Sequence, residues 1–249
     1  MIELKNLSGG YRRADVVRDI SLRLRGGRIT AVVGENGCGK STLFKLVCGQ
    51  LPPSGGAVLW RGRPLGGFTR TEIAQRISYL PQSRAVPDIS VGALVLHGRF
   101  PWLGYPRVYR AGDKAAAEAA MRQTEIWHKR HALLASLSGG ERQKAYIAMT
   151  LAQNTDCILL DEPTTHLDAA HQLACIELLH LLKDKGKAVA VVLHDINMAL
   201  ACADEMAVIK AGRLLAAGPP EQVLAAGALE EAFGVRVSRA EQIVFSRRL

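Results

Sequence analysis

The sequence predicts an α/β fold built on a largely parallel sheet. Apolar strands at 157–160 and 188–193 alternate with a helix near 169–183, and such alternation is typical of a parallel sheet covered on both faces. A strand at 29–33 leads into a glycine-rich loop and then a helix. The stretch 83–136 holds a run of alanines and little strand character, which predicts a mostly helical insertion.

The residues before the glycine-rich loop predict antiparallel strands. Apolar and polar residues alternate over 20–25, which is the period of a half-buried strand. Two glycines at 26–27 permit a tight reversal, so we expect a hairpin whose second strand, 29–33, enters the core. A shorter strand is expected at 57–60.

Composition places the chain among ordinary globular proteins. Its 249 residues are 48% hydrophobic and 22% charged, which excludes disordered, collagen-like and coiled-coil chains. No apolar run approaches the roughly 18 residues of a membrane span, and we expect no secretory leader. The net charge of +9 comes from scattered basic residues, so charge alone gives little reason to expect nucleic-acid binding. We expect the five cysteines to be reduced thiols.

The glycine-rich loop has the pattern G-x-x-x-x-G-K-[ST] between a strand and a helix, which is typical of a phosphate-binding loop. Its glycines let successive backbone N–H groups turn inward, and the helix N-terminus adds the positive end of its dipole. Lys40 can supply charge to the β- and γ-phosphates of a nucleotide, and the Ser41 hydroxyl can bind Mg²⁺. The predicted loop comprises Gly34, Glu35, Asn36, Gly37, Cys38, Gly39, Lys40, Ser41 and Thr42.

Two acids follow the predicted strand at 157–160. Side chains at the carboxyl end of a parallel strand face the crevice in which ligands bind. Asp161 is therefore placed to hold Mg²⁺, and Glu162 to orient or deprotonate an attacking water. The plain alternative is an acidic turn, which the phosphate-binding loop in the same chain disfavours.

A second glycine-rich segment opens a helix predicted over 141–153. Ser138 is a predicted N-cap, and Glu141 three residues later completes a capping box. A capping box does not explain Gly139 and Gly140, which weaken a helix but let an anion approach its free N–H groups.

The segment LSGGERQ at 137–143 resembles the signature of ABC transporter ATPases, and the resemblance extends over about residues 2–235. It implies a single ATPase domain with a P-loop NTPase core and a largely parallel sheet. It also implies an N-terminal antiparallel β-subdomain and an inserted α-helical signature subdomain at about 83–153. Residues 236–249 are then a C-terminal tail.

The resemblance implies roles for residues that are uninformative singly. Tyr11 resembles the aromatic that stacks on adenine, and Gln82 the Q-loop glutamine that meets Mg²⁺ and water. His194 resembles the switch histidine that holds the γ-phosphate. Asp168 ends a segment similar to the D-loop, although His166 departs from the small residue more usual there. Without the family, each of these would be read as an ordinary packed or surface side chain.

The resemblance also implies cofactors and partners. The family binds ATP and Mg²⁺ between two copies packed head to tail, so that Ser138, Gly139 and Gly140 of one copy close over the γ-phosphate held by the other. Separate transmembrane permease subunits are expected to dock on residues 82–136, with a substrate-binding protein as an indirect partner. This implies a peripheral position on the cytoplasmic face of the inner membrane.

Cargo is indicated by lineage, because the ATPase does not touch it. Residues 97–102, HGRFPW, resemble a Gly-Arg-Tyr-Pro segment of importers for iron–siderophore complexes, haem and cobalamin, and residues 163–172 and 193–197 point the same way. We favour an iron–siderophore importer, with haem, cobalamin or metal-oxyanion import as alternatives and export left open. Soluble relatives that act on nucleic acid or ribosomes carry long coiled coils or two cassettes, which this sequence lacks.

Overall fold

The computed structural model describes residues 1–11, 14–82, 85–164 and 167–236. Its strands form two sheets. The smaller sheet has the strand order β2-β1-β4-β5, and all its neighbouring strands are antiparallel. The larger sheet has the strand order β10-β9-β3-β8-β7-β6. Its strands are parallel from β9 to β6, and β10 is antiparallel to β9. The strands are β1 (Ile2–Tyr11), β2 (Ala14–Leu24), β3 (Arg28–Val33), β4 (Gly55–Trp60), β5 (Arg63–Pro64), β6 (Ile77–Leu80), β7 (Cys157–Asp161), β8 (Ala188–Val192), β9 (Glu205–Lys210) and β10 (Arg213–Gly218).

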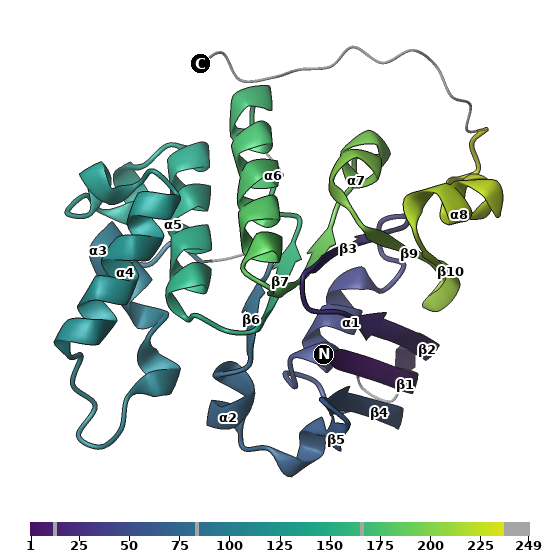
Figure 1. Cartoon of the computed structure of the whole chain (residues 1–249), viewed down its shortest axis with the longest axis horizontal. Helices are drawn as coiled ribbons and strands as arrows, with labels where there is room; N and C mark the ends of the chain where they lie inside the picture. Colours follow the sequence, from purple (N-terminus) through teal and green to yellow (C-terminus); the bar gives the residue numbers. More distant parts are fainter. Residues whose placement is uncertain (12–13, 83–84, 165–166, 237–249) are drawn as a thin grey trace.

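Most of the helices form three groups around the larger sheet (Figure 1). Helix α1 fills the space between the two sheets, α6 and α7 cover the other face of the larger sheet, and α3 to α5 gather beyond its β6 edge. The α-helices are α1 (Lys40–Val47), α2 (Arg70–Ala74), α3 (Val91–His97), α4 (Ala111–Gln123), α5 (Gly139–Ala152), α6 (Ala169–Asp184), α7 (Ile196–Cys202), α8 (Pro220–Ala225) and α9 (Ala228–Phe233). Short 3₁₀ turns lie at Leu65–Gly67, Phe100–Trp102, Trp127–Lys129 and Leu134–Ser136.

The central strands are apolar because both of their faces are covered. In β3, Ile29, Ala31 and Val33 pack on the side of α6 and α7, whereas Val32 packs on the side of α1. A strand with two buried faces carries a continuous apolar run instead of an alternating one. The predicted α/β fold with a helical insertion is therefore confirmed.

The predicted hairpin between residues 20–24 and 29–33 is wrong. Strand β2 pairs with β1, Leu24 lying opposite Ile2, while β3 pairs with β8 and β9 in the other sheet. Periodicity predicts that a segment is a strand but does not choose its partner. The doubly apolar β3 requires cover on both faces, which only the larger sheet offers.

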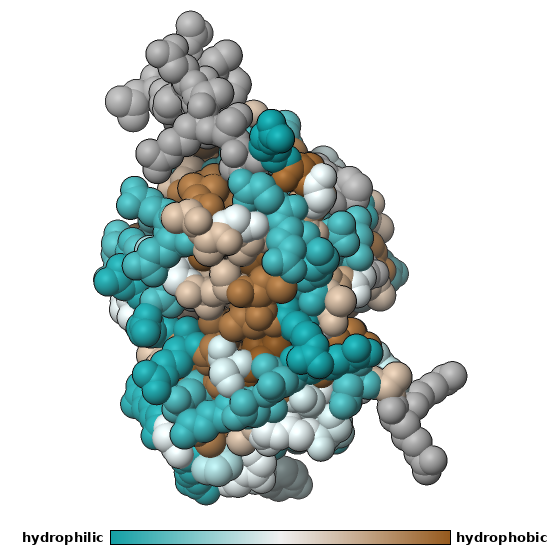
Figure 2. Space-filling view, turned by 90° about the vertical axis from the view of Figure 1, so that its right-hand side faces the viewer, coloured by the Kyte–Doolittle hydropathy of each residue, from teal (hydrophilic) through white to brown (hydrophobic). Residues whose placement is uncertain are grey.

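Most of the face shown in Figure 2 is hydrophilic, with a strip of apolar residues between the polar ones. Within the described ranges, no helix has both the length and the apolar character needed to cross a membrane. All five cysteines are described; none is in a disulfide, four are buried and Cys48 is half-buried.

Candidate active site

The carboxyl ends of four parallel strands meet at one edge of the larger sheet and bring distant segments together. The phosphate-binding loop follows β3, and Gln82 follows β6. Asp161 ends β7 and Glu162 comes directly after it, while His194 follows β8. Ligands of open α/β sheets bind at this edge. A cavity of about 270 Å³ lies there, and its lining residues are Val16, Asn36, Gly37, Gly39, Lys40, Ser41, Thr42, Gln82, Glu162 and His194.

The phosphate-binding loop has a backbone that only glycine adopts easily. Gly39, directly before α1, has φ +110°, and a Cβ atom on Gly34 would stand 2.1 Å from the carbonyl oxygen of Ile209. The side chain of Lys40 is almost fully buried, and its Nζ donates to the carbonyl oxygens of Gly34 and Glu35 at 2.8 and 2.7 Å. These bonds hold the ammonium group inside the loop, at the wall of the cavity.

The Glu162 carboxylate is contacted by side chains that follow two other strands, β6 and β8. Gln82 Nε2 donates to Glu162 Oε2 at 2.5 Å, and His194 Nε2 lies 2.5 Å from Oε1. The carboxylate is buried, whereas the His194 side chain is 42% exposed and borders the cavity. Glu162 also has φ +52°, a conformation that costs a non-glycine residue about 1–3 kcal/mol and clusters at functional sites. The arrangement can hold a carboxylate in one orientation and accept a proton from a water molecule beside it.

Asp161 has the chemistry of a magnesium ligand. Its Oδ2 accepts a hydrogen bond from the Tyr79 hydroxyl at 3.1 Å, while its Oδ1 is buried and has no hydrogen-bond donor among the described residues. Burial raises the pKa of Asp161, and Ser41 lies beside its carboxylate. Mg²⁺ is usually bound by one or two protein oxygens together with substrate phosphates. These residues therefore fit Mg²⁺.

Tyr79 was not anticipated by the sequence reasoning. It lies in β6, next to β7 in the sheet, and burial raises its pKa, so the phenol stays a hydrogen-bond donor. Its only local signal is a tyrosine in the short strand ISYL, which does not identify its partner.

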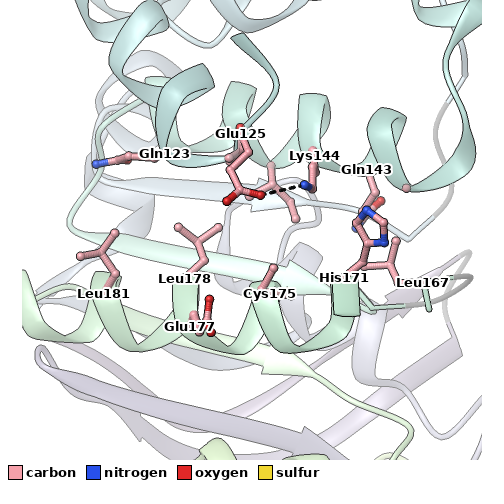
Figure 3. Close-up of a pocket in the computed structure, with 14 residues that line it drawn as sticks. Gln123, Glu125, Gln143, Lys144, Leu167, His171, Cys175, Glu177, Leu178 and Leu181 are labelled. Carbon is pink, nitrogen blue, oxygen red and sulfur yellow. Dashed lines mark hydrogen bonds and ion pairs between the residues drawn. The ribbon is translucent and has the colours of Figure 1, made fainter. Parts of the chain in front are cut away.

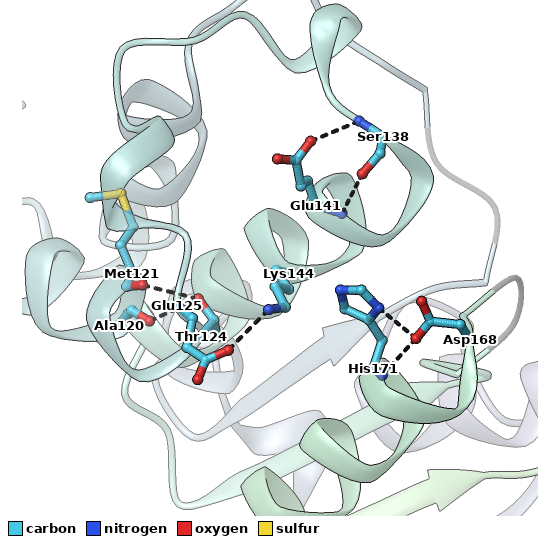
Figure 4. Close-up of polar contacts among 9 residues, drawn as sticks. All are labelled: Ala120, Met121, Thr124, Glu125, Ser138, Glu141, Lys144, Asp168 and His171. Carbon is cyan, nitrogen blue, oxygen red and sulfur yellow. Dashed lines mark hydrogen bonds and ion pairs between the residues drawn. The ribbon is translucent and has the colours of Figure 1, made fainter. Parts of the chain in front are cut away.

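The signature residues form the predicted helix cap. Ser138 Oγ accepts from the Glu141 amide at 3.3 Å, and Glu141 Oε2 accepts from the Ser138 amide at 3.0 Å (Figure 4). The capping box is thus confirmed, and α5 begins at Gly139, before the predicted start at 141. Five predicted signature and D-loop residues lie within the described ranges, and none of them lines the 270 Å³ cavity: Ser138, Gly139, Gly140, Glu141 and Asp168.

Tyr11 lies at the exposed end of β1. Its side chain does not line the cavity, and its hydroxyl accepts a hydrogen bond from Lys45 Nζ at 3.0 Å. At 43% exposure its ring is accessible to a ligand. The D-loop residues Thr165 and His166 lie outside the described residues.

Residues 17–165 match the ABC transporter family. The chain belongs to this family. It is 38% identical over 250 residues to the probable siderophore transport system ATP-binding protein YusV of Bacillus subtilis, covering 100% of this chain and 91% of YusV. It is 39% identical over 219 residues to the hemin import ATP-binding protein HmuV of Streptomyces coelicolor, covering 88% of this chain and 78% of HmuV.

A solved structure of cbiO1 from Clostridium perfringens, part of the ABC transporter complex cbiONQ, has a TM-score of 0.78 and 26% identity, covering 92% of each chain. The family resemblance and the fold predicted from the sequence are confirmed. This ABC transporter subunit is an ATP-binding protein, and its enzymatic activity is ATP hydrolysis.

Proposed function

We propose that this chain energises an importer of iron–siderophore complexes, as a homodimer that encloses two ATP molecules. In this proposal residues 2–235 are one ATPase domain, 83–153 are its helical insertion and 236–249 are a tail. The chain sits on the cytoplasmic face of the inner membrane, attached to transmembrane permease subunits.

The loop, Lys40 and Glu162 have different roles in ATP hydrolysis. The loop amides and the start of α1 bind the phosphates, and Lys40 turns its ammonium group from the loop carbonyls to the β- and γ-phosphates. Glu162, held by Gln82 and His194 at 2.5 Å each, orients a water molecule and accepts its proton. Asp161 and Ser41, with Gln82 nearby, would hold Mg²⁺, which when bound neutralises charge on the phosphates.

The two signature glycines carry the proposal of a sandwich dimer. A Cβ atom built on Gly139 would meet no described residue within 4 Å, and one on Gly140 would make only ordinary contacts there, the shortest 3.6 Å. Neither glycine has a positive φ. The fold of one chain therefore does not require glycine at the start of α5, where it weakens the helix. Glycine there is explained by a group from outside the chain that approaches the free helix amides, which an ATP phosphate on a second copy would do.

Two features support docking of permease subunits on the helical side. A groove of about 390 Å³ lies beside α2 and β6, next to but outside the expected docking surface at 82–136, and its lining residues include Arg70, Ile73 and Tyr79. Tyr79 also donates to Asp161, so this groove adjoins the proposed metal site. Several apolar side chains between α3 and α4 are exposed, which is typical of protein contact surfaces: Phe100, Trp102, Tyr105 and Val108.

The cargo is proposed from lineage. YusV is named for siderophore transport and HmuV for hemin import, and the segment 97–102 resembles importers of both kinds of cargo. Siderophore import is our first choice, and haem, cobalamin and metal oxyanions are the alternatives. ATPase stimulation in vesicles that contain the permease, by a binding protein loaded with each cargo in turn, decides between them.

The Glu162→Gln variant tests the sandwich. Phosphate binding is kept while water activation is lost, so size-exclusion chromatography with ATP and Mg²⁺ should show a dimer and ATP hydrolysis should fall to background. Wild-type hydrolysis by this variant would refute the role of Glu162. A monomer at saturating ATP would refute the sandwich.

A further inference from the structure

The start of the signature helix α5 is connected, within one chain, to the segment that follows Glu162. We propose that Gln143 and His171 are positioning residues: through them, nucleotide bound in the phosphate-binding loop changes the position of the first turn of α5. The inference rests on the proposed function, because it gives the signature segment a role in binding the second ATP.

Gln143 makes the more direct of the two connections. It lies in the second turn of α5 and is 8% exposed, and its Nε2 donates to the carbonyl oxygen of Pro163 at 2.6 Å. Pro163 follows Glu162 directly in the chain. A buried carbonyl that loses its donor is destabilised, because water does not replace the lost hydrogen bond. A shift of the backbone at Glu162 is therefore followed by Gln143 and the helix that carries it.

His171 makes the second connection, from the first turn of α6. Asp168 Oδ1 accepts from the His171 backbone amide at 2.9 Å and lies 2.7 Å from its Nδ1 (Figure 4). On its other side the imidazole faces Gly140, since a Cβ atom built there would stand 3.6 Å from Nε2. The ring is thus held by the N-cap of α6 and limits the position of the second signature glycine.

A cavity between α5 and α6 leaves the contacts of Gln143 and His171 to determine how the start of α5 is held. About 210 Å³ of open space lies between the facing sides of α5 and α6 (Figure 3). Ile147 borders it from α5, and Leu178 and Leu181 border it from α6. Close-packed side chains resist displacement, whereas open space permits it. The first turn of α5 can therefore move relative to α6, and Gln143 and His171 at the end of the cavity determine how it follows the segment after Glu162.

The connection has a consequence for the proposed dimer. Glu162 serves the ATP held by its own chain, whereas Ser138 to Gly140 serve the ATP held by the other copy. Contacts that join the two segments in one chain therefore couple the two ATP sites. Such coupling is reciprocal and commonly changes an affinity by about 5–150-fold.

Hydrogen–deuterium exchange of the full chain tests the inference in the monomer, with ADP and MgCl₂ as the ligand. ADP has no γ-phosphate and, under the proposed function, does not join two copies. The reporter is the peptide that spans residues 142–144, because the Arg142 amide donates to the Ser138 carbonyl at 2.9 Å and so senses opening of the first turn. We expect ADP to slow exchange there by about fivefold in the wild type, the lower end of such coupling.

Two variants and two controls make the test specific. Gln143→Met keeps the length of the side chain but removes the donor, and His171→Ala removes the ring; each should abolish the slowing at 142–144 while slowing within 37–47 stays as in the wild type. Gln153→Met removes a glutamine that donates to the Ala74 carbonyl from the other end of α5, and His180→Ala removes another histidine of α6. Both controls should keep the wild-type response.

The outcomes separate the two proposals. Wild-type slowing within 37–47 without slowing at 142–144 would overturn the coupling alone, as would retention of the slowing in both variants. No slowing at either place would overturn nucleotide binding and the coupling together. If far-ultraviolet circular dichroism shows that Gln143→Met is unfolded, Gln143→Leu, which also has no donor, replaces it; an unfolded His171→Ala is replaced by His171→Leu.

Discussion

Replacing Gly139 or Gly140 by alanine separates two reasons for which a glycine can be present at a helix start. If the chain itself needs the glycine, alanine destabilises the protein. If a ligand or partner needs it, alanine stabilises the free protein and damages activity. The structure favours the second outcome, because in the part of the chain that it describes the added methyl group meets nothing within 4 Å at Gly139 and stands 3.6 Å from His171 at Gly140.

The expected gain in stability follows from helix propensity, and the expected loss of ATP hydrolysis follows from the lost contact with the phosphate of the second chain's ATP. Alanine should raise the free energy of unfolding by about 0.5–1 kcal/mol for each substitution, which raises Tm by about 1–4 °C in a chain of this size. Displacing the phosphate of a second chain from one charged hydrogen bond removes about 1.5–3 kcal/mol. ATP hydrolysis should therefore fall by about 10–100-fold.

The assay compares thermal unfolding without nucleotide and steady-state ATPase activity. Gly112→Ala is the matched control, because Gly112 is the second residue of α4, as Gly140 is of α5, and a Cβ atom there also meets nothing within 4 Å. It should stabilise the chain equally and leave hydrolysis unchanged. Wild-type hydrolysis by the Gly139 and Gly140 variants, or a lowered Tm, would refute the reasoning.

Three further changes test the site and the cap. Lys40→Met removes a charge that is placed for phosphate, so nucleotide affinity measured by calorimetry should fall by about 1.5–3 kcal/mol; unchanged affinity would contradict the assignment. Tyr79→Phe removes the donor to Asp161 Oδ2. Mn²⁺ titration of the nucleotide complex should then show altered metal affinity, and the free energy of unfolding should fall by about 0.5–1.5 kcal/mol. Metal affinity identical to that of the wild type would show that this hydrogen bond does not orient the carboxylate. Glu141→Ala breaks the capping box and should cost about 1 kcal/mol, whereas Glu141→Gln should retain most of it. The hydrogen bond from the Ser138 amide lowers the pKa of Glu141. The carboxylate therefore stabilises the fold above its ordinary pKa of about 4.3, and this contribution is lost as pH falls through the lowered value. If the wild type exceeded Glu141→Ala in free energy of unfolding equally at pH 7 and at pH 3, this would be contradicted.

Local features were predictable because neighbouring residues produce them. The phosphate-binding loop needs only its own glycines, Lys40 and the strand and helix on either side. The capping box of Ser138 and Glu141 needs only two residues three positions apart, and the structure confirms it. The order of these motifs along the chain was also sufficient to predict the family.

The partners of strands and buried polar groups were decided only by the tertiary structure. The 20–24 segment looked like a hairpin partner of 29–33, yet the two strands lie in different sheets. The bonds from Tyr79 to Asp161 and from Gln143 to Pro163 join residues 82 and 20 positions apart. Periodicity reports which side of an element is apolar, but strand order decides which side chains then meet. For this reason the sequence by itself was sufficient to predict which residues would bind phosphate, and only the folded chain determined how those residues are held and joined.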